Sequence, residues 1–115
     1  MCHVLIIEDE ALIALDLQDI LAGTGATTFS FAETEQEAID AARLHRPDVI
    51  TSDVMLREGS GPEAVAAIQR ELGAMPVIFI TATPAACRPC PSPACILSKP
   101  VSDAAVRQAF RAVTT

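Results

Sequence analysis

Residues 3 to 10 read His-Val-Leu-Ile-Ile-Glu-Asp-Glu, an apolar run that ends abruptly in three acidic side chains. Three more short apolar runs follow along the chain, at residues 49–50, 76–80 and 96–97. Such runs are typical of strands that are dry on both faces, as in a parallel sheet covered by helices. The opening stretch therefore predicts the first strand of an α/β fold.

Amphipathic stretches between these runs predict the helices. A first helical stripe, ended by Gly23 or Gly25, consists of Ile13, Leu17, Ile20 and Leu21. A second helix begins at Thr34, where Thr-Glu-Gln-Glu is a capping box whose Glu37 can reach back to the Thr34 amide, and Arg46-Pro47 closes it. The position of residues 27–32 before this helix predicts another strand.

Two later stretches predict further helices. Pro62 suits a first helical position, and Gly73 ends a stripe that consists of Val65, Ile68 and Leu72. Ser102 can cap the last helix, whose stripe is Val106, Ala109, Phe110 and Val113. We therefore expect a five-stranded parallel sheet with helices on both faces.

Length and composition limit the functional classes. The 115 residues are too few for two ordinary cores, so we expect one domain over residues 1–115. The net charge of −7 and eight scattered basic residues disfavour direct nucleic-acid binding. The first apolar run lacks a basic flank, and no run approaches the ~20 residues that span a bilayer. A soluble, cytoplasmic protein without a membrane partner is expected.

The residues that end the predicted strands share one edge of the sheet. Ligands of open parallel sheets bind beyond the carboxyl ends of the strands. The ends in question are Glu8-Asp9, Asp53, Thr81 and Lys99-Pro100. Three carboxylates in close proximity raise one another's pKa unless a cation neutralises them, and a hard oxygen-lined site of this kind suits Mg²⁺. Lys99 and Thr81 can bind phosphate oxygens.

Each of these residues also has an ordinary structural explanation when it is considered alone. An Asp at a strand end is commonly a turn or cap residue, and acids such as Glu8 and Asp9 are favoured at the start of a helix. Thr81 suits a strand because it is β-branched, and Lys99 suits a solvated surface. Only their convergence indicates a site.

Four segments stand out together: Ile-Ile-Glu-Asp-Glu at 6–10, Pro-Asp-Val-Ile-Thr-Ser-Asp at 47–53, Pro-Val-Ile-Phe-Ile-Thr-Ala at 76–82, and Ser-Lys-Pro at 98–100. In this order and spacing they resemble the receiver domain of two-component response regulators over essentially the whole chain. The resemblance implies a flavodoxin-like, doubly wound sheet in the order 2-1-3-4-5. It also implies a cis bond between Lys99 and Pro100.

The resemblance further implies that Asp53 takes a phosphoryl group from the phosphohistidine of a sensor histidine kinase or histidine phosphotransfer protein. Asp9 would bind Mg²⁺ directly together with Asp53 and the Met55 carbonyl, whereas Glu8 would act mainly through a water. Thr81 and Lys99 would hold phosphoryl oxygens. Such a chain would catalyse only its own phosphorylation and dephosphorylation.

Two departures from the family concern signal output rather than the phosphorylation site. The aromatic residue that usually stands three positions before the lysine is replaced by Ile96, so an aromatic switch is excluded. Residues 83–95 are rich in Pro and Cys where the family has its fourth helix. Interior prolines each cost ~3 kcal/mol in a helix, so we expect that helix to be degenerate or absent, with at most one turn near Pro84 to Arg88.

Other interpretations remain open at this stage. An aspartate-nucleophile phosphatase of similar fold would need a second acid two residues after Asp53, where this chain has Met55. A thiol or zinc module on a receiver scaffold would use Cys87, Cys90 and Cys95, although reduced, inert thiols suit a cytoplasmic protein. His3 and His45 are expected to be packing or surface residues. The output is either a downstream protein partner or a phosphate-sink role, in a stand-alone regulator or a trimmed chain.

Overall fold

The computed structural model describes residues 2–82 and 94–114. Strands and helices alternate from β1 to β4, and β5 and α4 follow residues 83–93. The elements are β1 (His3–Ile7), α1 (Ala11–Ala22), β2 (Thr28–Ala32), α2 (Glu35–Leu44), β3 (Val49–Ser52), α3 (Gly61–Leu72), β4 (Val77–Thr81), β5 (Ala94–Ser98) and α4 (Asp103–Thr114).

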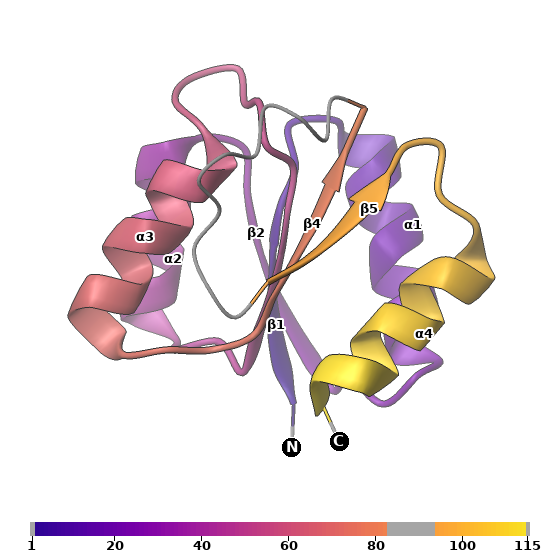
Figure 1. Ribbon diagram of the computed structural model, residues 1–115. Coiled ribbons are helices and arrows are strands. Elements are labelled where there is room, and N and C mark those ends of the chain that lie inside the picture. The colour runs from indigo at the N-terminus through magenta and orange to yellow at the C-terminus, as the bar shows by residue number, and fades with distance from the viewer. Residues whose placement is uncertain (1, 83–93, 115) are drawn as a thin grey trace.

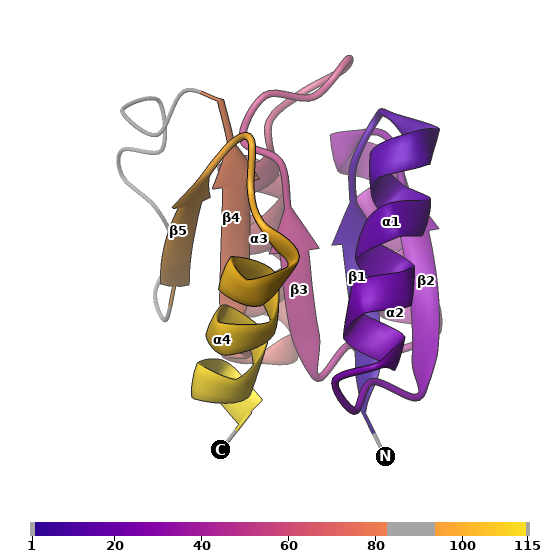
Figure 2. The ribbon, with the colours of Figure 1, turned by 90° about the vertical axis from the view of Figure 1, so that its right-hand side faces the viewer.

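All five strands form one parallel sheet in the order β2-β1-β3-β4-β5 (Figure 2). The helices α2 and α3 cover one face, and α1 and α4 cover the other (Figure 1). The expected doubly wound fold and its strand order are confirmed. The order reverses at β1, so the carboxyl ends of β1 and β3 flank the crevice where open sheets bind ligands.

Each face of the sheet carries its own aliphatic core. Successive side chains of a strand point to opposite faces, so Leu5 and Ile7 pack beneath α2 and α3, while Val4 and Ile6 pack beneath α1 and α4. The predicted stripe of α4 is also in place, because Val106 and Phe110 are buried. These two cores hold the strand ends rigidly at one edge.

The strand β2 departs from the expectation that every strand is dry on both faces. It lies at the edge of the sheet, and its Thr28 and Phe31 are exposed. Its polar positions are satisfied locally, because the His3 ring is hydrogen-bonded to the hydroxyls of Thr28 and Ser30 at 2.8 Å each. A strand with one neighbour keeps an open side, which explains its weaker apolar pattern.

Helix starts follow the predicted capping with two corrections. Thr34 accepts a hydrogen bond from the Glu37 amide at 3.1 Å, as expected, but the Glu37 carboxylate accepts from the Glu33 amide rather than from Thr34. Pro62 occupies the second position of α3 rather than the first, because Ser60 is the cap. A helix begins directly after the residue whose hydroxyl caps an amide of its first turn.

The remodelled fourth helix predicted for residues 83–95 falls mostly on residues 83–93, outside the described residues. The described part shows only that β5 begins at Ala94, one residue before the predicted entry at Cys95. Cys87 and Cys90 also lie outside it. Within the ranges 2–82 and 94–114, no helix combines the length and the apolar character that a bilayer crossing requires.

Candidate functional site

Asp53 directly follows β3 at the carboxyl edge of the sheet. Its backbone amide donates to the Ile7 carbonyl at 2.9 Å, which fixes it beside the end of β1. One carboxylate oxygen, Oδ1, accepts from the Val54 amide at 2.8 Å, and the other, Oδ2, accepts from the Lys99 ammonium at 3.0 Å. The side chain is 12% exposed, so this carboxylate is oriented but still reachable from solvent.

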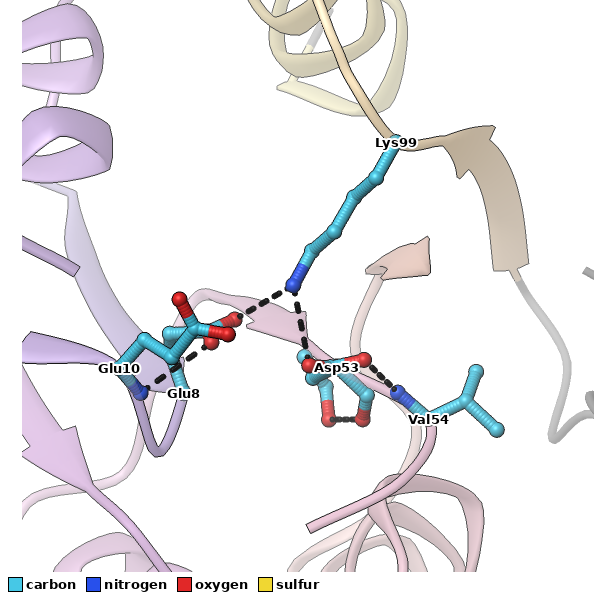
Figure 3. Close-up of polar contacts among 6 residues, drawn as sticks. Glu8, Glu10, Asp53, Val54 and Lys99 are labelled. Carbon is cyan, nitrogen blue, oxygen red and sulfur yellow. Dashed lines mark hydrogen bonds and ion pairs between the residues drawn. The ribbon is translucent and has the colours of Figure 1, made fainter. Parts of the chain in front are cut away.

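Lys99 reaches the same place from the end of β5. Its amide donates to the Thr81 carbonyl at 2.8 Å, and its peptide bond to Pro100 is cis, as the resemblance implied. Its extended side chain carries the ammonium between Asp53 and Glu8, 3.4 Å from the Glu8 Oε2 (Figure 3). One cation therefore bridges two carboxylates from β1 and β3.

Glu8 is the most buried carboxylate of the site, with a side chain only 2% exposed. Burial raises the pKa of Glu8 to about 7, while the Lys99 ammonium opposes this shift and the Asp53 carboxylate adds to it. Burial also works against the charge of Lys99, but its hydrogen bond to Asp53 and the nearby carboxylates outweigh it and raise the pKa of Lys99. Desolvation, more than the expected mutual repulsion, thus governs Glu8.

Three acids at the end of β1 lie close enough together to hold a metal ion. One carboxylate oxygen from each of Glu8, Asp9 and Glu10 lies within 4.8 Å of the others. This all-oxygen donor set fits a hard divalent cation such as Mg²⁺ and does not suit a thiolate-seeking metal. Glu10 was not among the expected ligands, and the acidic run at residues 8–10 is the signal that points to it.

Thr81 and Met55 are the remaining residues expected at the site. Thr81 is buried at the carboxyl end of β4, where it pairs with Ser98. Met55 has an exposed side chain and forms a backbone bridge with Ser60 in the loop after Asp53. The expected site residues therefore come from the ends of β1, β3, β4 and β5, at one edge of the sheet.

Gly61 was missed by sequence reasoning, although it shapes this site. A Cβ on Gly61 would overlap the Asp53 carbonyl oxygen and the Ser52 hydroxyl. Its amide donates to the Val54 carbonyl at 2.8 Å, so the start of α3 closes tightly over the chain around Asp53. Only glycine permits this approach of two backbones.

Residues 4–89 match the family model described as the response regulator receiver domain. The chain belongs to this family. Receiver domains are phosphoacceptor signalling domains of two-component systems.

Relatives agree with this membership. The receiver domain is 40% identical over 108 residues to the phyllosphere-induced regulator PhyR of Methylorubrum extorquens, a match that covers 90% of this chain and 40% of that protein. It is 38% identical over 81 residues to the polar-differentiation response regulator DivK of Brucella anthropi, covering 69% and 65% of the two chains. The chain thus spans less than two thirds of either relative.

A solved structure shows the same architecture. The solution structure of the PhyR response regulator receiver domain from Erythrobacter litoralis superposes with a TM-score of 0.84 at 33% identity, covering 99% of this chain and 93% of that one. The similarity therefore extends through β5 and α4, beyond the residues that the family model matches.

The histidines of the receiver domain lie away from Asp53, as expected. His3 begins β1 at the opposite edge, and its ring stacks on that of His45 with centroids 3.5 Å apart. Burial lowers the pKa of His3, which favours the neutral ring in this stack. His3 is buried whereas His45 is exposed, and the half-buried Cys2 lies at the same amino end of β1.

Proposed function

We propose that Asp53 accepts a phosphoryl group from the phosphohistidine of a sensor histidine kinase or a histidine phosphotransfer protein. The observation that carries the proposal is the Asp53 carboxylate, held by the Lys99 ammonium and the Val54 amide beside the acidic cluster at residues 8–10. A carboxylate oxygen of Asp53 bonds to phosphorus as the bond from phosphorus to the imidazole nitrogen breaks, and the electron pair stays on the imidazole. Positioning and charge neutralisation are the main requirements of such a transfer.

The same proposal assigns a role to each neighbour. Asp9, Asp53 and the Met55 carbonyl would hold Mg²⁺, and Glu8 would act mainly through a water. When bound, the metal neutralises the charge that gathers on the transferred oxygens. Lys99 pairs with one phosphoryl oxygen and therefore gives up part of its contact with Asp53. The Thr81 hydroxyl donates to another oxygen.

We further propose that residues 1–115 form one receiver domain that modifies only itself. Position 55, where a phosphatase of similar fold would place its second acid, is a methionine with a 64% exposed side chain. This observation favours a phosphoacceptor over a phosphatase, because no acid stands there to protonate a leaving group. The output of the phosphorylated domain is either a downstream protein partner or a phosphate-sink role, in the cytoplasm.

Intact-mass spectrometry with a small acyl phosphate and Mg²⁺ tests the assignment. We expect the mass of one added phosphoryl group on the wild type, none on Asp53→Asn, and none when a chelator is present. Asp48→Asn is the matched control, because its carboxylate lies at the other edge and accepts from the His3 amide at 2.8 Å. Full labelling of Asp53→Asn would refute the proposal.

A further inference from the structure

The loop that follows Asp53 is fastened to the start of α2. This loop, residues 55–60, rises above the carboxyl edge of the sheet between β3 and α3 (Figure 1). It is fastened by Glu35, the first residue of α2. The Glu35 amide donates to the Glu58 carbonyl at 3.1 Å, and the Glu35 Oε1 accepts from the Ser60 amide at 3.1 Å. One residue thus binds the loop on both sides of Gly59.

The close packing of Gly59 against Glu35 shows that this contact is specific. Gly59 has φ of +84°, a conformation that other residues rarely adopt, and a Cβ there would overlap the Glu35 side chain. The loop and Glu35 are therefore fitted to each other by shape as well as by hydrogen bonds. An exposed ion pair between Arg57 and Glu33, 3.3 Å long, lies alongside.

The contact leads directly to the phosphoacceptor site. Ser60, whose amide is held by Glu35, forms an antiparallel backbone bridge with Met55. Met55 is two residues after Asp53 and offers the backbone carbonyl proposed above as a metal ligand. The first link of this path is the Glu35 side-chain oxygen, and from the Ser60 amide to Met55 the path consists of backbone groups.

We propose that Glu35 is a positioning residue for the divalent-cation site, and that it acts by its Oε1 acceptor through the Ser60–Met55 bridge rather than by its charge. The inference rests on the proposed function. Partners that orient metal ligands from outside the coordination sphere are known to tune metal affinity. Glu35 itself touches neither the cation nor the phosphoryl group.

Two substitutions separate the acceptor from the charge. Glu35→Gln keeps a carbonyl oxygen at the same reach and removes the charge. Glu35→Asp keeps the charge and withdraws the oxygen by about one bond length, ~1.5 Å, beyond hydrogen-bonding distance of the Ser60 amide. Both residues are compatible with the first turn of a helix.

Titration with Mg²⁺ alone, followed by calorimetry, is the first measurement. We expect Glu35→Asp to weaken Mg²⁺ binding by about threefold to tenfold, the range that one lost hydrogen bond allows, and Glu35→Gln to stay within about twofold of the wild type. Equal affinities in all three proteins would overturn the inference. Weaker binding in Glu35→Gln than in Glu35→Asp would overturn it in favour of a charge effect.

Two further measurements distinguish a positioning role of Glu35 from a merely structural one. The Mg²⁺ concentration for half-maximal labelling of Asp53 should rise in Glu35→Asp, with the rate at saturating Mg²⁺ unchanged. Hydrogen exchange of the Ser60 amide should be faster in Glu35→Asp only. If the wild type itself binds no Mg²⁺, the proposed metal site fails, whereas normal wild-type binding with an unaffected Glu35→Asp refutes this inference alone.

Discussion

Removing the charge of Glu8 should stabilise the metal-free protein at high pH. Glu8 is buried, and its pKa rises from an ordinary value of 4.5 to about 7. The folded state therefore binds the Glu8 proton more tightly than the unfolded state does. Stability from this group is present below pH 4.5 and declines as the pH rises towards 7, because the folded protein must then ionise a desolvated carboxyl.

The magnitude follows from the size of the shift. A pKa difference of about 2.5 units, from 4.5 to about 7, corresponds to a cost of roughly 3 kcal/mol once Glu8 is ionised in both states, since each unit is worth ~1.4 kcal/mol. The side chain is 2% exposed, so solvent screening removes little of this cost. Glu8→Gln keeps the size of the side chain and abolishes the ionisation.

Urea unfolding of the wild type and Glu8→Gln with a chelator present checks the reasoning. At pH 8 we expect Glu8→Gln to be more stable by roughly 2 to 3 kcal/mol, and at pH 4.5 the two proteins should differ by less than about 1 kcal/mol. Glu10→Gln makes the same charge change at an exposed neighbour and should show little pH-dependent gain. A Glu8→Gln difference that is the same at both pH values would refute the argument.

Two other substitutions test the packing and charge of the site. Gly61→Ala should lose about 1 to 3 kcal/mol in thermal unfolding because its Cβ would overlap the Asp53 carbonyl, whereas Gly23→Ala meets its nearest atoms at 3.6 Å and should be nearly neutral; equal losses would contradict the close approach. Lys99→Met should cost about 2 kcal/mol at pH 8 and clearly less at pH 5, because Glu8 then carries a proton and needs no counter-ion; a loss independent of pH would show that the contact with Glu8 does not govern the effect.

Local patterns were sufficient to predict most of the fold. Apolar runs gave β1 and β4 to within a residue, and helical spacing together with the hydroxyls of Thr34 and Ser102 located the starts of α2 and α4. These features depend on neighbours a few residues apart, which the sequence displays directly. The parallel topology then brings the strand ends to one edge, so Asp53 and its partners could be predicted to converge.

Only the tertiary structure decided how the groups at that edge of the sheet interact. Lys99 contacts Glu8 across 91 positions of sequence and Asp53 across 46, and the raised pKa of Glu8 reflects burial that no local pattern measures. The contact of Glu35 with the loop also joins segments remote in sequence, and the tight approach of Gly61 to Asp53 depends on how the start of α3 packs. Sequence spacing specifies which groups meet at the edge, whereas distances, burial and charge balance emerge only when the separate elements pack together.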